Sequence, residues 1–519
     1  MKQIRTIVKK TVQISMLTQL SRLLGIAREL LMIKFLGVGG FSDAFLTAYK
    51  IPNSLRKVFA EGALSAAFVP SIVRIATPEN TQAVSRLMSL AFLLFEGMCT
   101  VVVLICIWFA QPLLKLIAPG FSSEQIFFAT ICLAILMPFI LFISSASLLA
   151  GALQAVGHFI IPAFTPVLLN IFFIGAIILS LWYQLPITFL CWALVAGSIT
   201  QFLLHLYVYL KYNFGFARPR AQEWQQIRAI FIKFAACLPT ISFSEINLFI
   251  DTSFASLLPK GSVSLLYYAN RFMGIPLGVL IGSFATVLLP HFSRISTNNP
   301  RRLSFYLHES VKTVLWLTLP IMIIMLLCSY KLFETLFISD KFTPAHAIEA
   351  SHILSIFLCG LVFLAVNRIF LNTFYALHST MMPALIALCS LIVNVICNAL
   401  FLRSMGTLGL ALATTLSALV QTILFAVILA RKFRVGVQVK NISSFLQKYC
   451  LQLLLLGLPL LGMHYSISSM LTYYAPITAS NFFVHKIGFW FWTGPVCALY
   501  AILLFVTRKF FKIRLFFID

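Results

Sequence analysis

The stretch VQISMLTQLSRLLGIARELLMIKFL, residues Val12–Leu36, is apolar enough to enter a bilayer, yet it carries Arg22 and Arg28 in its interior. A cation at the centre of a bilayer costs roughly 2.5–3.5 kcal/mol on insertion scales. Further cations, Lys50 and Arg56, follow in the next segment. A chain that keeps several such cations is expected to hold them against a water-filled cavity, where they can meet an anionic ligand. The pattern indicates a transporter with a cationic cavity.

The composition of the whole chain assigns it to integral membrane proteins. Its 519 residues are 61% hydrophobic and 10% charged, with a mean hydropathy of +0.98, whereas soluble domains average about 25% charged residues. The net charge of +24 fits the excess of Lys and Arg on the cytoplasmic loops of membrane proteins, so we expect no nucleic-acid partner. The eleven cysteines include no CxxC spacing and predict neither disulfides nor a metal site.

Apolar segments of about 20 residues, the length of a membrane-spanning helix, recur along the chain. We predict an all-α polytopic membrane protein with about 14 transmembrane helices. The predicted helices centre on residues 12–36, 42–75, 87–110, 126–150, 160–182, 187–210, 229–257, 264–290, 311–330, 347–371, 380–402, 407–430, 446–467 and 487–507. Pro52 and Pro276 are expected to break or kink the second and the eighth of these.

Basic residues gather in every second connection between the predicted helices, whereas the other connections are short or mixed in charge. Because cytoplasmic loops are enriched in Lys and Arg, this alternation places both termini in the cytoplasm of a bacterial inner-membrane protein. The basic connections carry Arg74 and Arg86, then Lys211, Arg218, Arg220 and Arg228, then Arg294, Arg301 and Arg302, then Arg431, Lys432, Arg434 and Lys440, and finally Arg508, Lys509, Lys512 and Arg514.

The chain also contains a weak internal repeat. Shifts of 220 and 221 residues align Gly62 with Gly282, Pro70 with Pro290, Arg74 with Arg294, Ile75 with Ile295, Ala155 with Ala376, Pro162-Ala163 with Pro383-Ala384, and Gln201 with Gln421. Six predicted helices separate the aligned positions, so the two copies share orientation and are parallel repeats that enclose a central site. We therefore predict an N-terminal lobe over 1–215, a C-terminal lobe over 216–438, and two additional helices over 439–519.

Several motifs resemble those of the MurJ (MviN) family. They are Ser21 to Glu29 (SRLLGIARE), Ser42 to Phe45 (SDAF), Lys50 to Asn53 (KIPN), Arg56 to Ala63 (RKVFAEGA), Gly261 to Ser264 (GSVS), Tyr267 to Arg271 (YYANR), Leu288 to Pro290 (LLP) and Gly406 to Thr415 (GTLGLALATT). The resemblance implies a lipid II flippase of the multidrug/oligosaccharidyl-lipid/polysaccharide exporter superfamily. Such a protein moves undecaprenyl-pyrophosphate-linked disaccharide-pentapeptide to the outer leaflet for peptidoglycan synthesis.

The resemblance also implies which residues bind this substrate. Its pyrophosphate suits guanidinium groups, whose planar fork donates two parallel hydrogen bonds. The residues that would line or border the central cavity are Arg22, Arg28, Asp43, Lys50, Arg56 and Arg271. The polyprenyl tail would lie in a groove formed by helices 13 and 14. The chain departs from some relatives after Arg271, where Met273-Gly274-Ile275 replaces an acidic position and Asn270 replaces an aspartate.

Each of these residues also has a purely structural interpretation. The arginines of the first helix could extend to the membrane interfaces, and the cations after Pro52 could form an ordinary polar connection. Arg271 could be paired with a carboxylate or with backbone carbonyls, and Asp43 could cap a helix.

A second constellation implied by the resemblance is a possible sodium site formed by Asp251, Asn394, Asn398 and Thr414. Asn394 and Asn398 stand one turn apart and share a helix face, and hard cations prefer oxygen ligands. Asn398 stands where a carboxylate is expected, which lowers the charge of the site. The alternative is hydrogen bonding between polar residues inside the bundle. The driving force would be a sodium gradient or the membrane potential.

Four functional interpretations follow. The first is a lipid II flippase, expected to be monomeric, with membrane lipids as its other partners and no cofactor. The second is a flippase for another polyprenyl-pyrophosphate-linked glycan, and the third is a drug/cation antiporter of the same superfamily, which would need acidic cavity residues. The fourth is a membrane enzyme acting on polyprenyl phosphates, which would need clustered carboxylates or histidines that the sequence lacks. We expect no enzymatic activity.

Overall fold

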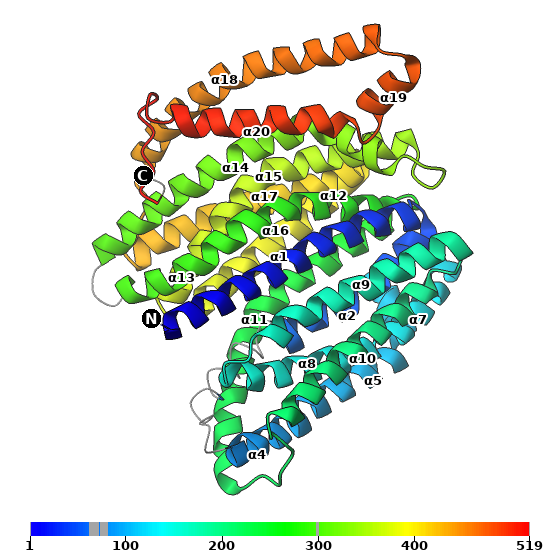
Figure 1. The fold of residues 1–519 in the computed structure, drawn as a ribbon, viewed down its shortest axis with the longest axis vertical. Helices are drawn as coiled ribbons and strands as arrows, with labels where there is room; N and C mark the ends of the chain where they lie inside the picture. The colour runs from blue at the N-terminus through cyan, green and yellow to red at the C-terminus, as the bar shows by residue number, and fades with distance from the viewer. Residues whose placement is uncertain (1, 62–71, 73–80, 297–299, 518–519) are drawn as a thin grey trace. The chain divides into compact units, whose positions relative to one another are not determined.

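The computed structural model describes residues 2–61, 72, 81–296 and 300–517, and every regular element within these residues is helical (Figure 1). In hydrocarbon a chain must satisfy its own backbone hydrogen bonds, and a helix does so within one segment. The predicted all-α membrane class is confirmed. Ala63 and the repeat positions Gly62, Pro70, Arg74 and Ile75 lie outside the described residues.

The chain separates into two compact units, Met1–Ser264 and Leu265–Asp519. Unit 1 contains α1 Lys2–Leu36, α2 Gly40–Arg56, η1 Lys57–Glu61, α4 Thr81–Ala91, η2 Phe92–Glu96, α5 Gly97–Trp108, α6 Ala110–Ile117, α7 Ser123–Leu136, α8 Pro138–Ala155, α9 Ile160–Tyr183, α10 Thr188–Lys211, α11 Ala221–Ser256 and the start of α12 Ser262–Pro276. The η segments are π-helical. These units are defined by compactness, whereas the predicted lobes were defined by the internal repeat. The division into 1–215, 216–438 and 439–519 therefore stays a prediction.

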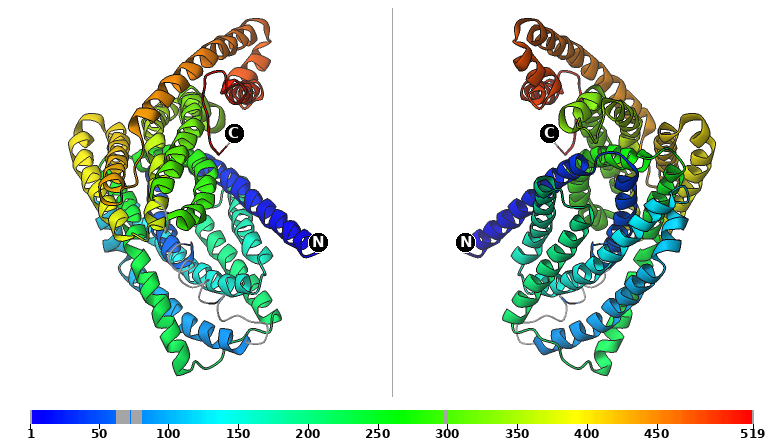
Figure 2. Two further views of the ribbon diagram at one scale, coloured as in Figure 1. Left: turned by 90° about the vertical axis from the view of Figure 1, so that its left-hand side faces the viewer. Right: turned by 90° about the vertical axis from the view of Figure 1, so that its right-hand side faces the viewer.

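Unit 2 holds the rest of α12 and a tightly packed set of helices. These are η3 Leu277–Ile281, α13 Gly282–Ser296, α14 Pro300–Phe337, α15 Pro344–Ala376, α16 Met381–Met405, α17 Thr407–Lys432, α18 Val439–Tyr474, α19 Ile477–His485 and α20 Phe489–Thr507. Helix α15 packs between α14 and α17, and its Thr343 side chain caps its first turn (Figure 1). Helices α18 and α20 form a hairpin through α19 (Figure 2).

Eleven helices of the described residues are long and apolar enough to cross a membrane. They coincide with eleven of the predicted spans, and the total of fourteen stays a prediction. The other three predicted spans, 12–36, 42–75 and 229–257, correspond to α1, to α2 with η1, and to α11. These three segments contain most of the predicted polar residues of unit 1. The hydropathy required of a membrane span therefore excludes the segments in which these polar residues are concentrated.

The helix bounds repeat along the chain at the predicted offset. Helices α1, α2, α9 and α10 begin at residues 2, 40, 160 and 188, and helices α11, α12, α16 and α17 begin at 221, 262, 381 and 407, which is 219 to 222 residues later. The internal repeat inferred from scattered identities therefore extends to the lengths of the helices.

Both prolines that were expected to interrupt a helix precede a π-helical turn. Helix α2 continues through Pro52 to Arg56 before η1 begins at Lys57, whereas α12 ends at Pro276 and η3 begins at the next residue. Proline removes one backbone donor and disturbs the regular hydrogen-bond ladder. The two π-helical turns start 220 residues apart, at 57 and 277, so the repeat preserves this irregularity as well.

Candidate functional site

The polar face of α2 is joined to α11 by side-chain hydrogen bonds. Lys50, Ser54 and Lys57 are spaced four and three residues apart and so lie on one helix face. Lys50 Nζ donates to Thr252 Oγ1 at 2.6 Å. Ser54 Oγ and Lys57 Nζ donate to the two carboxylate oxygens of Glu245 at 2.6 and 2.7 Å. We call these five residues the α2–α11 polar seam.

Glu245 is the acidic residue of the seam, and the sequence analysis did not identify it. Its side chain is only 11% exposed, whereas that of its partner Lys57 is 38% exposed. A buried carboxylate needs a counter-charge and hydrogen-bond donors, and Lys57 and Ser54 supply them. The available signal was an ionisable residue inside an otherwise apolar helix, which is a functional candidate by default in a membrane protein.

Asp43 fixes the start of α12. Its Oδ2 accepts from the Gly261 N–H at 2.6 Å, and its Oδ1 accepts from the Ser264 N–H at 2.8 Å and from Ser264 Oγ at 2.5 Å. Gly261 has φ 101°, and a Cβ there would stand 2.5 Å from Val38 Cγ1, so only glycine suits this turn. The geometry gives Asp43 a capping role, and its predicted contact with substrate stays a prediction.

Arg28 is oriented by neighbours on α1 and α9. Its Nη1 donates to Asn170 Oδ1 at 3.2 Å, and its Nη2 donates to Glu29 Oε1 at 2.6 Å. Its guanidinium carbon lies 5.5 Å from the centre of the Phe173 ring. Asn170 in turn donates to the Ser21 carbonyl at 3.0 Å. These contacts hold the guanidinium in one orientation while leaving its side chain 17% exposed.

Arg22 lies on the same helix as Arg28 and is partly buried. Both predicted arginines therefore remain within α1 rather than at its ends, since this helix runs from Lys2 to Leu36. This is the position expected of arginines that contribute positive charge to a cavity, and that role stays a prediction.

Arg56 lines a cavity of about 220 Å³ inside unit 1, which we call the Arg56 cavity. Its polar lining includes Thr165 of α9 and Gln201 and His205 of α10. Thr165 Oγ1, Gln201 Oε1 and His205 Nε2 are buried and find no hydrogen-bond partner among the described residues. Buried polar atoms of this kind are usually satisfied by water, and a water occupies about 30 Å³. The cavity therefore has the size and the polarity to be hydrated.

Arg271 is held by a tyrosine of its own helix. Its Nη2 donates to the Tyr267 hydroxyl at 2.7 Å, and its guanidinium carbon lies 4.7 Å from the centre of the Tyr267 ring. The spacing of four residues brings both side chains to one face of α12. Five of the six predicted binding residues lie in unit 1 and Arg271 lies in unit 2, and a cavity shared by the units stays a prediction.

The four predicted sodium ligands are distributed over both units. Asp251 belongs to unit 1 and is partly buried, whereas Asn394, Asn398 and Thr414 belong to unit 2. The Asn398 amide donates to Asn394 Oδ1 at 2.8 Å, and Thr414 Oγ1 donates to the Leu410 carbonyl at 3.1 Å. One amide oxygen thus already accepts a hydrogen bond from one turn along α16, and the sodium site stays a prediction. Within the described part of the chain, no cluster of three His, Cys, Asp or Glu residues could hold a metal.

Comparison with known proteins gives consistent matches over most of the chain. A sequence profile described as "Lipid II flippase MurJ" matches residues 32–482. A probable lipid II flippase MurJ of Rhizobium meliloti is 32% identical over 433 residues, covering 81% of this chain and 80% of that protein. The lipid II flippase MurJ of Burkholderia cenocepacia is 30% identical over 419 residues, covering 79% and 81%.

Solved structures agree with these sequence matches. A structure described as lipid II flippase MurJ in an inward closed conformation aligns with a TM-score of 0.75 and 26% identity, over 96% of this chain and 99% of that one. An inward-facing multidrug transporter of the MATE family aligns with a TM-score of 0.66 and 12% identity, over 78% and 92%. The second match shows a shared fold alone.

Proposed function

The chain belongs to the MurJ family of lipid II flippases, and from this premise we propose that it moves lipid II from the cytoplasmic to the outer leaflet of the bacterial inner membrane. The substrate is undecaprenyl-pyrophosphate-linked disaccharide-pentapeptide. Its polar head cannot cross hydrocarbon unaided, so a hydrated cavity with alternating access must carry it. Both termini would lie in the cytoplasm, and a monomer with two repeats would suffice.

The observation that carries this proposal is the oriented arginine within α1. Arg28 is partly buried and its guanidinium is fixed by Asn170, Glu29 and Phe173. Because its direction is set before substrate arrives, little side-chain entropy is lost on binding. A guanidinium held in this way favours a pyrophosphate oxygen, which accepts charge-assisted hydrogen bonds.

Two further arginines would act with Arg28 on the same head group. Arg56 borders the Arg56 cavity, where water can solvate sugar and phosphate groups. Arg271 belongs to the second repeat and is oriented by Tyr267. We assign all three to the pyrophosphate, so that substrate binding would involve both repeats and would favour a state in which both are engaged.

The polyprenyl tail would lie along the α18–α20 hairpin. Helix α18 exposes a run of leucines, and exposed apolar surface in a membrane protein marks contact with lipid or ligand. The most exposed members of this run are Leu451, Leu454, Leu455 and Leu458. A groove here would keep the tail in the bilayer while the head crosses.

Energy would come from the membrane potential or from a sodium gradient. The Asn394–Asn398 hydrogen bond occupies one of the oxygens that sodium would need, and we derive no transport step through the ion. A net positive cavity is itself sensitive to membrane potential, because moving one charge through 100 mV changes its energy by about 2.3 kcal/mol.

Complementation tests the proposal. Cells depleted of their own lipid II flippase would express the intact chain, Arg28→Ala, or Lys34→Ala, which removes an exposed cation from the same helix. We expect growth with the intact chain and with Lys34→Ala, and lysis with an equally abundant Arg28→Ala. Failure of a well-inserted intact chain would contradict lipid II as the substrate and favour another polyprenyl-pyrophosphate-linked glycan.

A further inference from the structure

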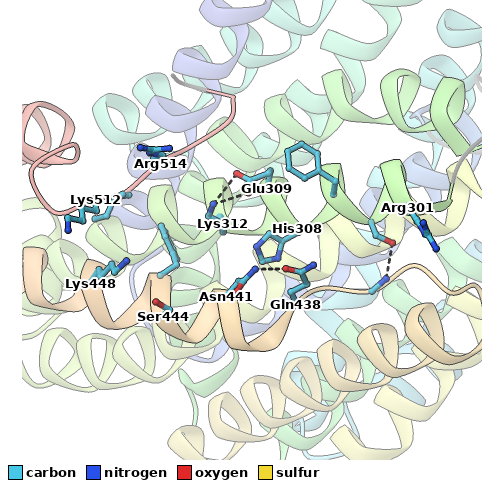
Figure 3. Close-up of a pocket in the computed structure, with 15 residues that line it drawn as sticks. Arg301, His308, Glu309, Lys312, Gln438, Asn441, Ser444, Lys448, Lys512 and Arg514 are labelled. Carbon is cyan, nitrogen blue, oxygen red and sulfur yellow. Dashed lines mark hydrogen bonds and ion pairs between the residues drawn. The ribbon is translucent and has the colours of Figure 1, made fainter.

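A second pocket, of about 610 Å³, lies within unit 2 and is separate from the residues discussed above. Its walls come from the first three turns of α14, the connection after α17, the start of α18 and the C-terminal tail that follows α20 (Figure 3). We call it the basic pocket. Three candidate membrane spans begin or end at its edge, at Pro300, Val439 and Thr507, so it lies where helices meet the membrane surface.

The lining of the basic pocket is strongly cationic. It includes Arg301, Lys448, Lys512 and Arg514, which come from three separate segments. One acidic residue, Glu309, is also in the lining, and Lys312 offsets its charge with contacts of 2.9 and 3.1 Å to the two carboxylate oxygens. The lining therefore contains more cations than carboxylates, and such a field attracts anions.

The C-terminal tail that supplies two of these cations is anchored. Ile513 and Leu515 are fully buried in the core of unit 2, while the alternate residues Lys512 and Arg514 are exposed. The Phe516 N–H donates to Glu309 Oε2 at 3.4 Å. Because the apolar residues fix the tail, its cations stay beside Lys448 of α18 (Figure 3). The site is thus built into the fold.

Neutral donors complete the wall opposite the tail. His308 is 7% exposed and its Nδ1 finds no hydrogen-bond partner in the described residues. Asn441 and Ser444 come from the first two turns of α18, whose N-terminus carries a partial positive charge. The Gly436 N–H donates to Ser304 Oγ at 3.2 Å and holds the preceding connection against α14. With a proton on Nδ1, this buried imidazole would donate a hydrogen bond to an anionic oxygen beside the helix start.

We propose that the basic pocket binds a phosphate group. Arg and Lys side chains and a helix N-terminus are groups that bind phosphate oxygens in proteins, and all of them occur in this lining. The phosphate could belong to the head group of an anionic membrane lipid, since basic pockets between membrane helices recognise such head groups, or it could be a free ion. This site lies outside the predicted transport cavity, and the inference holds whether or not lipid II is the substrate.

The test uses the purified full-length protein in mild detergent. Its Tm would be followed by intrinsic fluorescence during titration with dihexanoyl-phosphatidylglycerol, with dihexanoyl-phosphatidylcholine, and with inorganic phosphate. The pocket variant is Lys448→Gln/Lys512→Gln/Arg514→Gln. The matched control is Arg431→Gln/Lys432→Gln/Lys440→Gln, which removes three exposed cations at the end of α17 and the start of α18 that are outside the pocket lining.

We expect phosphatidylglycerol to raise the Tm of the intact chain and of the control, because a ligand that binds only the folded state stabilises it. The pocket variant should need about tenfold more phosphatidylglycerol for the same rise in Tm. Phosphatidylcholine should raise the Tm of all three proteins only weakly. An effect of inorganic phosphate alone, lost in the pocket variant, would identify a free ion as the source. If both triple variants respond like the intact chain, or if neither ligand changes the Tm, the proposal is wrong. Arg514→Gln alone serves if the triple variant misfolds.

Discussion

Helices α2 and α12 are the same element in the two repeats, and they hold their cations differently. Each is followed by a π-helical turn, at Lys57–Glu61 and Leu277–Ile281. Each carries a cation before that turn, Lys50 in α2 and Arg271 in α12. Lys50 donates to Thr252 on another helix, whereas Arg271 donates to Tyr267 one turn back on its own helix.

The difference indicates which parts of the repeat are shared. The backbone irregularity recurs, and functional membrane helices often contain such π-helical turns. The side-chain partners do not recur, because each is supplied by whatever packs nearby. In α2 the lysines belong to the α2–α11 polar seam, so a substitution in the seam on one helix also removes a partner from the other helix. In α12 a tyrosine of the same helix contacts the guanidinium.

Asp43→Ala should have the largest effect on stability. Asp43 and Ser264 stand 221 residues apart, close to equivalent places in the two repeats, and are bonded to each other. The substitution leaves the Gly261 and Ser264 N–H groups buried without an acceptor, which costs about 3 kcal/mol. The Tm of the detergent-purified protein should fall clearly. The Tm of Ser264→Ala should fall less, because this variant keeps both backbone donors bonded to Asp43. Equal losses of Tm in the two variants would contradict the capping role of Asp43.

Glu245→Gln tests how much the α2–α11 polar seam contributes to stability. The substitution leaves Lys57 without its carboxylate partner. The free energy of unfolding should fall by only about 1–2 kcal/mol, because solvent screens Lys57 at 38% side-chain exposure. Thermal unfolding measures it. The matched variant Lys57→Gln should cost more than Glu245→Gln, since it leaves the buried carboxylate without a cation. The opposite order would show that the seam does not depend on this pair.

Tyr267→Phe tests the contact between Tyr267 and Arg271 within α12. The ring remains under the guanidinium, but the hydrogen bond of the hydroxyl to Arg271 is lost. We expect flux to fall by about threefold to tenfold with unchanged stability, because one charge-assisted hydrogen bond orients the cation. The companion Thr252→Val removes the partner of Lys50 and should have a smaller effect, since the lysine also interacts electrostatically with Asp43. Unchanged flux in Tyr267→Phe would separate Arg271 from transport.

Replacing sodium by potassium should have the smallest effect. The Asn394 oxygen already accepts the Asn398 amide, and Asp251 lies in the other unit. We expect the transport rate to change by less than about twofold, because the Asn394 and Thr414 side chains already take part in hydrogen bonds within their own helices. A rate that falls by an order of magnitude in potassium, and recovers in sodium, would establish the sodium site.

The sequence predicted the helical class, the repeat offset and the cationic character of α1, because hydropathy and charge are local properties of the chain. It did not identify Asn170 as the partner of Arg28 or Glu245 as the partner of Lys57. These contacts span 142 and 188 residues and depend on which helices pack together. The cations of the tail were predicted only as cytoplasmic charges, since their meeting with Lys448 requires that Ile513 and Leu515 be buried.

A reconstituted transport assay tests the central claim most directly. Vesicles containing lipid II with a fluorescent head group would receive the intact chain, Arg28→Ala, Arg271→Ala or Lys34→Ala, and the accessible fraction of fluorophore would be followed in time. The account predicts rapid equilibration with the intact chain and with Lys34→Ala, and at least about tenfold slower equilibration with either arginine variant. Equal rates in all four proteins would contradict transport through cations contributed by both repeats.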